Sequence, residues 1–152
     1  MIKKTSQSGR SMVEMLGVIA IIGLITVAGV TSMGYVDSYF RSSATVIEID
    51  DLAKDIVDTY SWSANFSDLD METICEEGIL KCTNQVGKNR WGGDITVAPS
   101  GAGNSTFTIT YNNVPQIPCE QLLHASSEDE FHYVTAENIQ CSDNSTMNFI
   151  LK

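Results

Sequence analysis

The run from Met15 to Val36 contains no Asp, Glu, Lys or Arg in 22 consecutive residues. As an α-helix, at about 1.5 Å per residue, this run is roughly 33 Å long, which is enough to cross the hydrocarbon core of a bilayer. A secretory signal peptide has an apolar stretch of only about 7 to 15 residues. The sequence therefore predicts a membrane span that stays in the mature protein.

Charged residues divide the chain into an apolar stem and an acidic head. Eighteen of the 19 acidic residues lie between Asp37 and Lys152, whereas Lys3, Lys4 and Arg10 precede the apolar run. A short basic flank predicts a cytoplasmic N-terminus, which places the head in the periplasm. The length supports one compact domain. An acidic surface repels phosphates, and no basic stripe follows Asp37, so nucleic-acid binding by the isolated head is excluded.

Glu14 stands at the edge of the apolar run, where an ionised carboxylate carries a desolvation cost and needs a partner. The polar leader MIKKTSQSG ends at Gly9, so a protease at the cytoplasmic face could remove it and leave the span intact. The new amino group of Arg10 would then lie one helical turn before Glu14, or meet Glu14 of a neighbouring subunit. Alternatively, the Glu14 side chain reaches back to water at the membrane interface.

The segment MIKKTSQSGRSMVEMLGVIAIIGLITVAG resembles the N-terminus of a type IV prepilin. In that family a short basic leader ends in glycine, a prepilin peptidase cuts after it, the new first residue is methylated, and a glutamate stands fifth in the mature chain. Gly9 and Glu14 match these positions. Arg10 is the candidate for methylation, although the first mature residue in the family is most often phenylalanine or another apolar residue.

The resemblance implies three segments. Residues 1–9 are a cleaved leader, residues 10–36 a transmembrane and polymerisation helix, and residues 37–152 a globular head that includes the second half of the long helix. Gly17, Gly23, Gly29 and Gly34 would let membrane helices approach closely, or are simply tolerated in the span. Because glycine weakens a helix by about 1 kcal/mol relative to alanine, we expect the stretch from Gly23 to Gly29 to unwind when subunits leave lipid for a fibre.

Residues after the span repeat at alternating intervals of three and four, which predicts that one helix continues to about Tyr60. Four acidic side chains fall largely off this stripe and are expected to form a solvated face. The stripe is Tyr39, Ser42, Val46, Ile49, Ala53, Ile56 and Tyr60, widened by Ile47, Leu52 and Val57, and the acids are Asp50, Asp51, Asp55 and Asp58.

The rest of the head predicts an α+β fold, in which the long helix packs on a small antiparallel sheet. A loop over 61–70 leads to a short helix over 71–79. The runs NRWGGDITVAP and NSTFTITYNNV, joined by PSGAGN, predict a β-hairpin, with Trp91 in the core. A second helix is expected to begin at Pro118, and MNFIL to form a closing strand.

Four cysteines lie in the exported part, where the periplasmic machinery oxidises thiols: Cys75, Cys82, Cys119 and Cys141. Three disulfide connectivities are possible, and sequence proximity favours Cys75 with Cys82 and Cys119 with Cys141. A zinc site needs two tight cysteine pairs, whereas 6 residues separate the first pair and 21 the second. The pattern therefore favours a disulfide-stabilised head with no metal.

The segment NRWGGDITV also resembles the Trp-Gly motif that opens the sheet in type IVb pilins and in PilS-like pilins of conjugative thin pili. PCEQLL together with Cys141 resembles their disulfide-closed C-terminal region. The resemblance implies a structural subunit of a surface fibre for adhesion, motility or conjugation. Its implied partners are copies of itself, the prepilin peptidase, the assembly platform and its ATPase, and the inner membrane before assembly.

Two other functions stay open. A minor pilin or a type II secretion pseudopilin would share the same N-terminal motif. A signal-anchored periplasmic binding module or enzyme would not polymerise. Catalysis has little support in the sequence, because His124 and His132 lack a cysteine or serine in any nucleophile setting, and no glycine loop that could bind a phosphate follows a strand. We therefore expect no enzyme activity and no cofactor.

Overall fold

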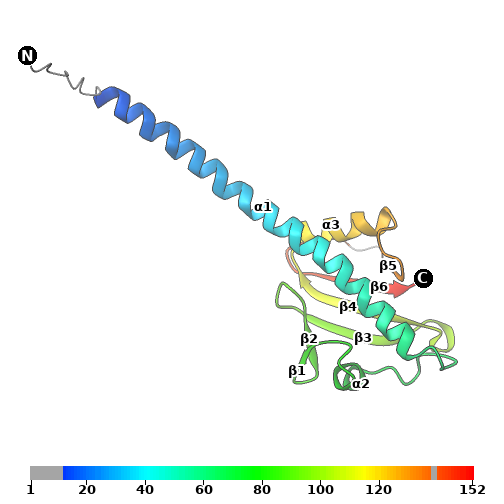
Figure 1. Cartoon of the computed structure of the whole chain (residues 1–152). Coiled ribbons are helices and arrows are strands. Elements are labelled where there is room, and N and C mark those ends of the chain that lie inside the picture. Colours follow the sequence, from blue (N-terminus) through cyan, green and yellow to red (C-terminus); the bar gives the residue numbers. More distant parts are fainter. Residues whose placement is uncertain (1–11, 138–139) are drawn as a thin grey trace, which may run out of the picture. The chain divides into compact units, whose positions relative to one another are not determined.

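The computed structural model describes residues 12–137 and 140–152 (Figure 1). These residues divide into two compact units, one that ends at Asp37 and one that begins at Ser38. The helix α1, Met12–Thr59, contributes to both units. Its end at Thr59 confirms the prediction of a helix that continues to about Tyr60.

Within the second unit, α1 buries one face against the rest of the head. Ile49, Ala53 and Ile56 are fully buried, and Leu52 is nearly so. This spacing of three and four residues is the predicted stripe. The prediction is wrong for Tyr39, the first residue of the stripe, and for Ile47 on its flank. Their side chains are 62% and 64% exposed.

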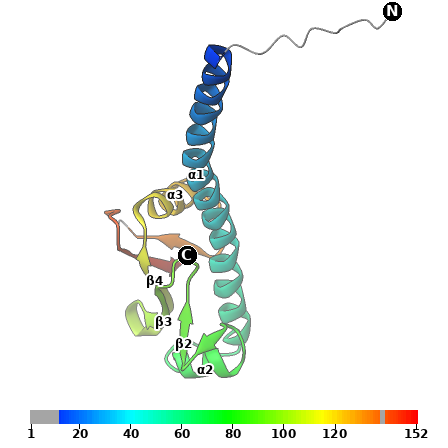
Figure 2. The same cartoon turned by 90° about the vertical axis from the view of Figure 1, so that its left-hand side faces the viewer.

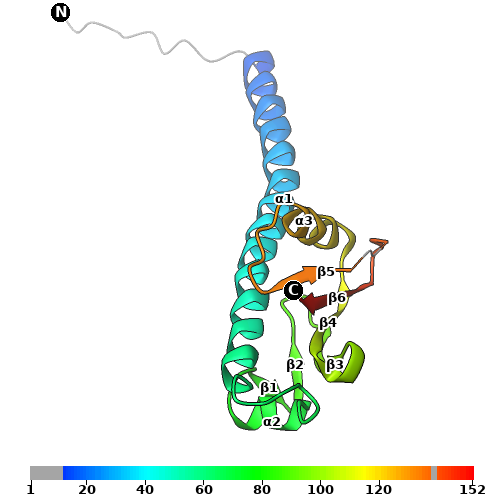
Figure 3. The same ribbon diagram turned by 90° about the vertical axis from the view of Figure 1, so that its right-hand side faces the viewer.

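The head contains one six-stranded sheet in which all neighbouring strands are antiparallel (Figures 1 and 3). The spatial order is β1-β2-β3-β4-β6-β5, so the chain leaves the sheet after β4 and returns along its far edge. The strands are β1 Cys82–Thr83, β2 Val86–Lys88, β3 Asp94–Ser100, β4 Thr106–Val114, β5 Val134–Ala136 and β6 Ser145–Leu151. This α+β arrangement confirms the predicted fold class.

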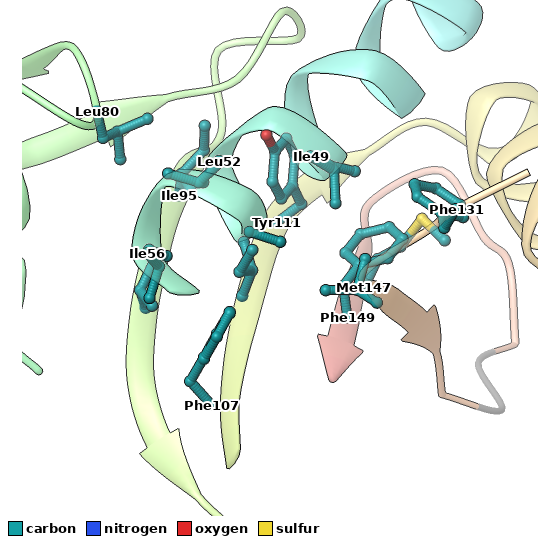
Figure 4. Close-up of a cluster of buried hydrophobic side chains, with 14 of the residues drawn as sticks. Ile49, Leu52, Ile56, Leu80, Ile95, Phe107, Tyr111, Phe131, Met147 and Phe149 are labelled. Atoms are coloured by element: carbon teal, nitrogen blue, oxygen red, sulfur yellow. The ribbon is translucent and has the colours of Figure 1, made fainter. Parts of the chain in front are cut away.

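The strands β3 and β4 form the predicted hairpin, in which Ile95 pairs with Tyr111 and Ser100 with Thr106. The turn between them contains a short 3₁₀ helix, Ala102–Asn104. Because side chains alternate between the two faces of a strand, one face carries Ile95, Phe107 and Tyr111 into the core, and the other carries threonines outward. Figure 4 shows this core between α1 and the sheet, and β6 adds Met147 and Phe149 to it.

The helix α2, Met71–Glu76, is shorter than the helix predicted over 71–79. Gly78 adopts a positive φ of 75°, a conformation that stops a helix and favours glycine. Asp70 caps the other end, where its carboxylate accepts a hydrogen bond of 2.7 Å from the backbone N–H of Thr73. This bond lowers the pKa of Asp70, so the cap stabilises the fold above the ordinary Asp pKa and is lost as the pH falls through the lowered value.

The helix α3, Gln116–Ser127, begins two residues before the predicted start at Pro118. Pro115 occupies the N-cap position, and Pro118 is the third residue of the helix. A proline is tolerated there because backbone N–H groups in the first turn have no partner within the helix.

The Trp-Gly segment forms the turn between β2 and β3, so the expectation that it opens the sheet is wrong. The strands β1 and β2 precede it at that edge of the sheet. Asn89 organises the turn, because its Oδ1 accepts hydrogen bonds from the backbone N–H groups of Trp91 and Gly93, and its Nδ2 donates to the Asn112 carbonyl. A Cβ atom at Gly93 would overlap with that carbonyl, which explains the glycine. Trp91 packs against the core but stays partly exposed.

Asp50 ties α1 to the segment that precedes β5. Its Oδ1 accepts hydrogen bonds of 2.9 and 3.0 Å from the backbone N–H groups of His132 and Tyr133, and its Oδ2 lies 2.9 Å from Nδ1 of His132. The Asp50 side chain is only 15% exposed. The prediction that Asp50 belongs to a solvated acidic face is therefore wrong, because the repeat along α1 does not reveal a partner 82 residues away.

Replacing Asp50 by alanine is expected to lower the free energy of unfolding by about 2 to 3 kcal/mol, because two backbone N–H groups lose a charged acceptor. Urea unfolding of the full chain in detergent micelles, followed by tryptophan fluorescence, would measure the change. Asp51→Ala is the matched control, since Asp51 is exposed on the same turn and should cost less than about 0.5 kcal/mol. Equal effects of the two substitutions would contradict the assigned role of Asp50.

A second connection joins α1 to the Trp-Gly turn. Arg90 Nε donates to Glu48 Oε2 at 3.1 Å, and the Tyr111 hydroxyl donates to Glu48 Oε1 at 3.4 Å. Burial raises the pKa of Tyr111, so the phenol keeps its proton and acts as the donor. Glu48 therefore holds both the turn and the centre of β4 against the helix.

Candidate functional site

The apolar half of α1 is exposed among the residues that the structure describes. Its large apolar side chains between Met12 and Val36 are 52% to 81% exposed, apart from those that the structure leaves undescribed. Among the described residues, α1 is the one helix that is long and apolar enough to cross a membrane. The core helix of a soluble protein passes the same test of length and composition, but it is mostly buried, and here none of the apolar window is. This surface therefore needs lipid or another protein to cover it.

Glu14 lies in the first turn of α1 and is exposed. A carboxylate at this end of a helix interacts favourably with the helix dipole. Apolar side chains surround it, since Glu14 lines a shallow surface hollow together with Met15, Val18 and Ile21. Gly9 and Arg10 lie outside the described residues, so the pairing of Glu14 with the amino group of Arg10 stays a prediction.

The four glycines of this segment lie on the helix surface. A Cβ atom added at Gly17, Gly23, Gly29 or Gly34 would meet nothing within 4 Å. The chain's own packing therefore does not require glycine at these positions, which is consistent with a role in contacts between helices. The stretch from Gly23 to Gly29 is helical here, and its unwinding in a fibre stays a prediction.

The four cysteines form two disulfides, Cys75 with Cys82 and Cys119 with Cys141. This is the pairing that sequence proximity favours. The first disulfide joins the end of α2 to β1 at one edge of the sheet. The second joins α3 to the segment that leads into β6. Each disulfide therefore ties a helix of the head to a segment at or next to the sheet.

His124 and His132 are both exposed, with side chains 70% and 79% accessible. His124 lies 3.6 Å from Glu128 on the surface of α3, and His132 pairs with Asp50. In the part of the chain that the structure describes, no three side chains of His, Cys, Asp or Glu are grouped to bind a metal.

Comparison with protein families decides the identity of the head. The model of the PilS N-terminal domain matches residues 40–149, which is most of the chain. The chain belongs to the PilS family. PilS is a type IVb pilin family, so the resemblance inferred from the sequence is confirmed. No curated protein and no solved structure matches the chain.

The match to PilS begins after the apolar run and so does not use the prepilin-like N-terminus. The head and the N-terminal segment thus indicate a pilin independently of each other. Membership in a pilin family indicates a structural subunit of a pilus that assembles with copies of itself, and it favours a non-enzymatic role. The apolar helix is consistent with a membrane anchor before assembly.

Sequence reasoning missed Asp50 and Glu48, which hold the head together. Both belong to α1, but their partners lie 42 to 83 residues further along the chain. No local motif marks such pairs.

Proposed function

We propose that this PilS family chain is a structural subunit of a type IV pilus, polymerised through its N-terminal helix into a surface fibre. The observation that carries the proposal is the uncovered apolar half of α1 in a chain whose head matches a pilin family. Lipid covers this surface before assembly, and the same surface of neighbouring copies covers it in the fibre.

The proposed course begins in the bacterial inner membrane, with the N-terminus in the cytoplasm and the head in the periplasm. Prepilin peptidase cuts between Gly9 and Arg10, and the new amino group of Arg10 is the candidate for methylation. An assembly platform and its ATPase then move the subunit out of the membrane. Because lipid and the helix bundle are both apolar, burial of apolar surface contributes little to this transfer, so close helix packing and the Glu14 pair direct it.

Cleavage after Gly9 should change the charge of the mature chain in a measurable way. It removes Lys3 and Lys4, which reduces nine basic residues to seven against 19 acids, so the formal charge changes from −10 to −12. Mass spectrometry of subunits from sheared surface fibres would identify a first residue at Arg10. A mature chain that still begins at Met1 would contradict the proposal and favour a signal-anchored module. Scarcity of the chain in these fibres would favour a minor pilin or a pseudopilin.

A further inference from the structure

Trp62 is the most exposed large apolar side chain of the described head, at 97%. The loop that carries it, between α1 and α2, is nevertheless anchored on both sides of the indole. The ring of Phe66 packs against the rings of Tyr60 and Phe107, with centroids 5.9 and 5.0 Å apart, and the backbone N–H of Phe66 donates to the Asn104 carbonyl. An anchored loop thus holds an indole in water, and tryptophan is a residue type that is enriched at protein interfaces.

A groove of about 250 Å³ lies between α1 and α3. Tyr39 and Val46 of α1 and Gln121 and Ala125 of α3 contribute to its walls. It is smaller than the roughly 300 to 1,000 Å³ of small-molecule sites, and it is of the size of one large side chain. Gln121 Oε1 is buried and has no hydrogen-bond donor among the described residues. Gln121 is one of the residues that line the groove, so its side-chain amide lies beside the space that an incoming group would fill.

The exposed indole and the groove complement each other. The indole has an N–H donor and needs an acceptor when it is buried, and Gln121 Oε1 is an acceptor that needs a donor. The ring would also find aromatic and aliphatic surface on Tyr39 and Val46. One contact between them would explain both the exposed indole of Trp62 and the unpaired buried oxygen of Gln121.

Trp62 cannot reach the groove of its own chain. Ser43 lines the groove, whereas the loop that carries Trp62 begins after Thr59. Thr59 is 16 residues further along α1 than Ser43, which corresponds to about 24 Å of helix. In Figures 2 and 3, α3 lies beside one end of the part of α1 that belongs to the head. The helix α2, which follows the loop, lies at the other end. A projection and a recess at opposite ends of a molecule make a head-to-tail contact, which propagates into an open filament when the rotation between copies does not close into a ring.

We propose that Trp62 of one copy inserts into the groove between α1 and α3 of the next copy. The ring packs against Tyr39 and Val46, and its N–H donates to Gln121. The inference rests on the proposed function, because it assigns a contact between heads within the pilus. Copies joined in this way are displaced by roughly 25 Å along the axis of α1.

Fluorescence quenching tests the burial of Trp62 directly. The chain has two tryptophans, so Trp91→Phe leaves Trp62 as the sole reporter. Acrylamide is the suitable quencher because it is neutral, whereas the head is strongly acidic. We expect efficient quenching in the detergent-solubilised monomer and protection in sheared fibres. Equal quenching in both states would overturn the inference and leave the proposed function intact. Failure of the wild-type chain to form fibres would instead refute the proposed function.

Substitutions test the groove as the occupied site. Trp62→Ala should raise the rate at which subunits leave sheared fibres by about 30-fold or more, which is the effect of truncating an interface hot spot. Ser43→Trp, which places an indole at the groove from the same chain, should have a similar effect. Ser63→Ala, in the same loop and also exposed, is the matched control and should leave the rate unchanged. Protection of Trp62 without any effect of Ser43→Trp would show that another surface covers it, and would overturn the proposal.

Discussion

Replacing Glu14 by alanine is expected to abolish fibres while the chain is still processed and still accumulates in the membrane. The substitution makes the span more apolar, so membrane insertion should be retained or improved. In the fibre, the charged N-terminus would enter a helix bundle with little water and lose its nearest carboxylate. Removing one partner of a buried ion pair costs roughly 3 to 5 kcal/mol, and this cost recurs with each subunit added.

Electron microscopy of fibres, together with an immunoblot of the membrane fraction, would measure both parts of this result. Glu14→Gln separates charge from size, because it keeps the shape of the side chain and removes its charge. We expect Glu14→Gln to assemble as poorly as Glu14→Ala. Wild-type fibre numbers in both variants would show that the side chain simply reaches water at the interface and has no essential role in assembly.

The sequence predicts those elements of the head whose signal is local. In the helix through Ile49, Ala53 and Ile56, apolar residues repeat every three or four positions. In the hairpin of β3 and β4, apolar and polar residues alternate on both sides of a glycine-rich turn. The cysteine pairs are also local, because their partners are 7 and 22 residues apart. Short closing distances favour these pairs in the unfolded chain as well as in the folded one.

The elements that sequence reasoning missed depend on contacts far along the chain. The strands β1, β2 and β5 have only two or three residues each, too few for an alternation to be seen, and they exist because a neighbouring strand supplies hydrogen bonds. The role of Asn89 depends on the Asn112 carbonyl of β4. Similarly, nothing near Asp50 in the sequence indicates that it accepts hydrogen bonds from the backbone before β5.

The candidate site could be predicted in outline only. The absence of charge from Met15 to Val36 is a property of the sequence, and the structure adds that the described residues leave this surface exposed. The cut after Gly9 depends on recognition by another protein, and the pairing of Glu14 depends on a neighbouring copy. Exposure of Trp62 could not be predicted either, since a tryptophan between serines reads equally well as a core residue under a loop.

Removing the disulfide between Cys119 and Cys141 is expected to destabilise the head more than removing the one between Cys75 and Cys82. The partners are 22 residues apart in the first case and 7 in the second. By loop-closure entropy, the two cross-links contribute about 3.4 and about 2.4 kcal/mol. Burial widens the difference, because Cys119 is fully buried and both partners of the other disulfide are partly exposed.

The comparison uses two matched double variants of the full chain in detergent micelles, Cys119→Ala with Cys141→Ala and Cys75→Ala with Cys82→Ala. The first should lower the unfolding midpoint by roughly 10 °C or more, since about 1 kcal/mol shifts a domain of this size by several degrees. Membrane insertion should be unchanged in both, because no cysteine lies in the apolar run. Equal shifts, or a larger one for the second variant, would show that loop length does not govern the contribution of these cross-links. The stability of the head would then depend more on how the segment between α2 and β1 packs against the sheet than on the closure of α3 onto β6.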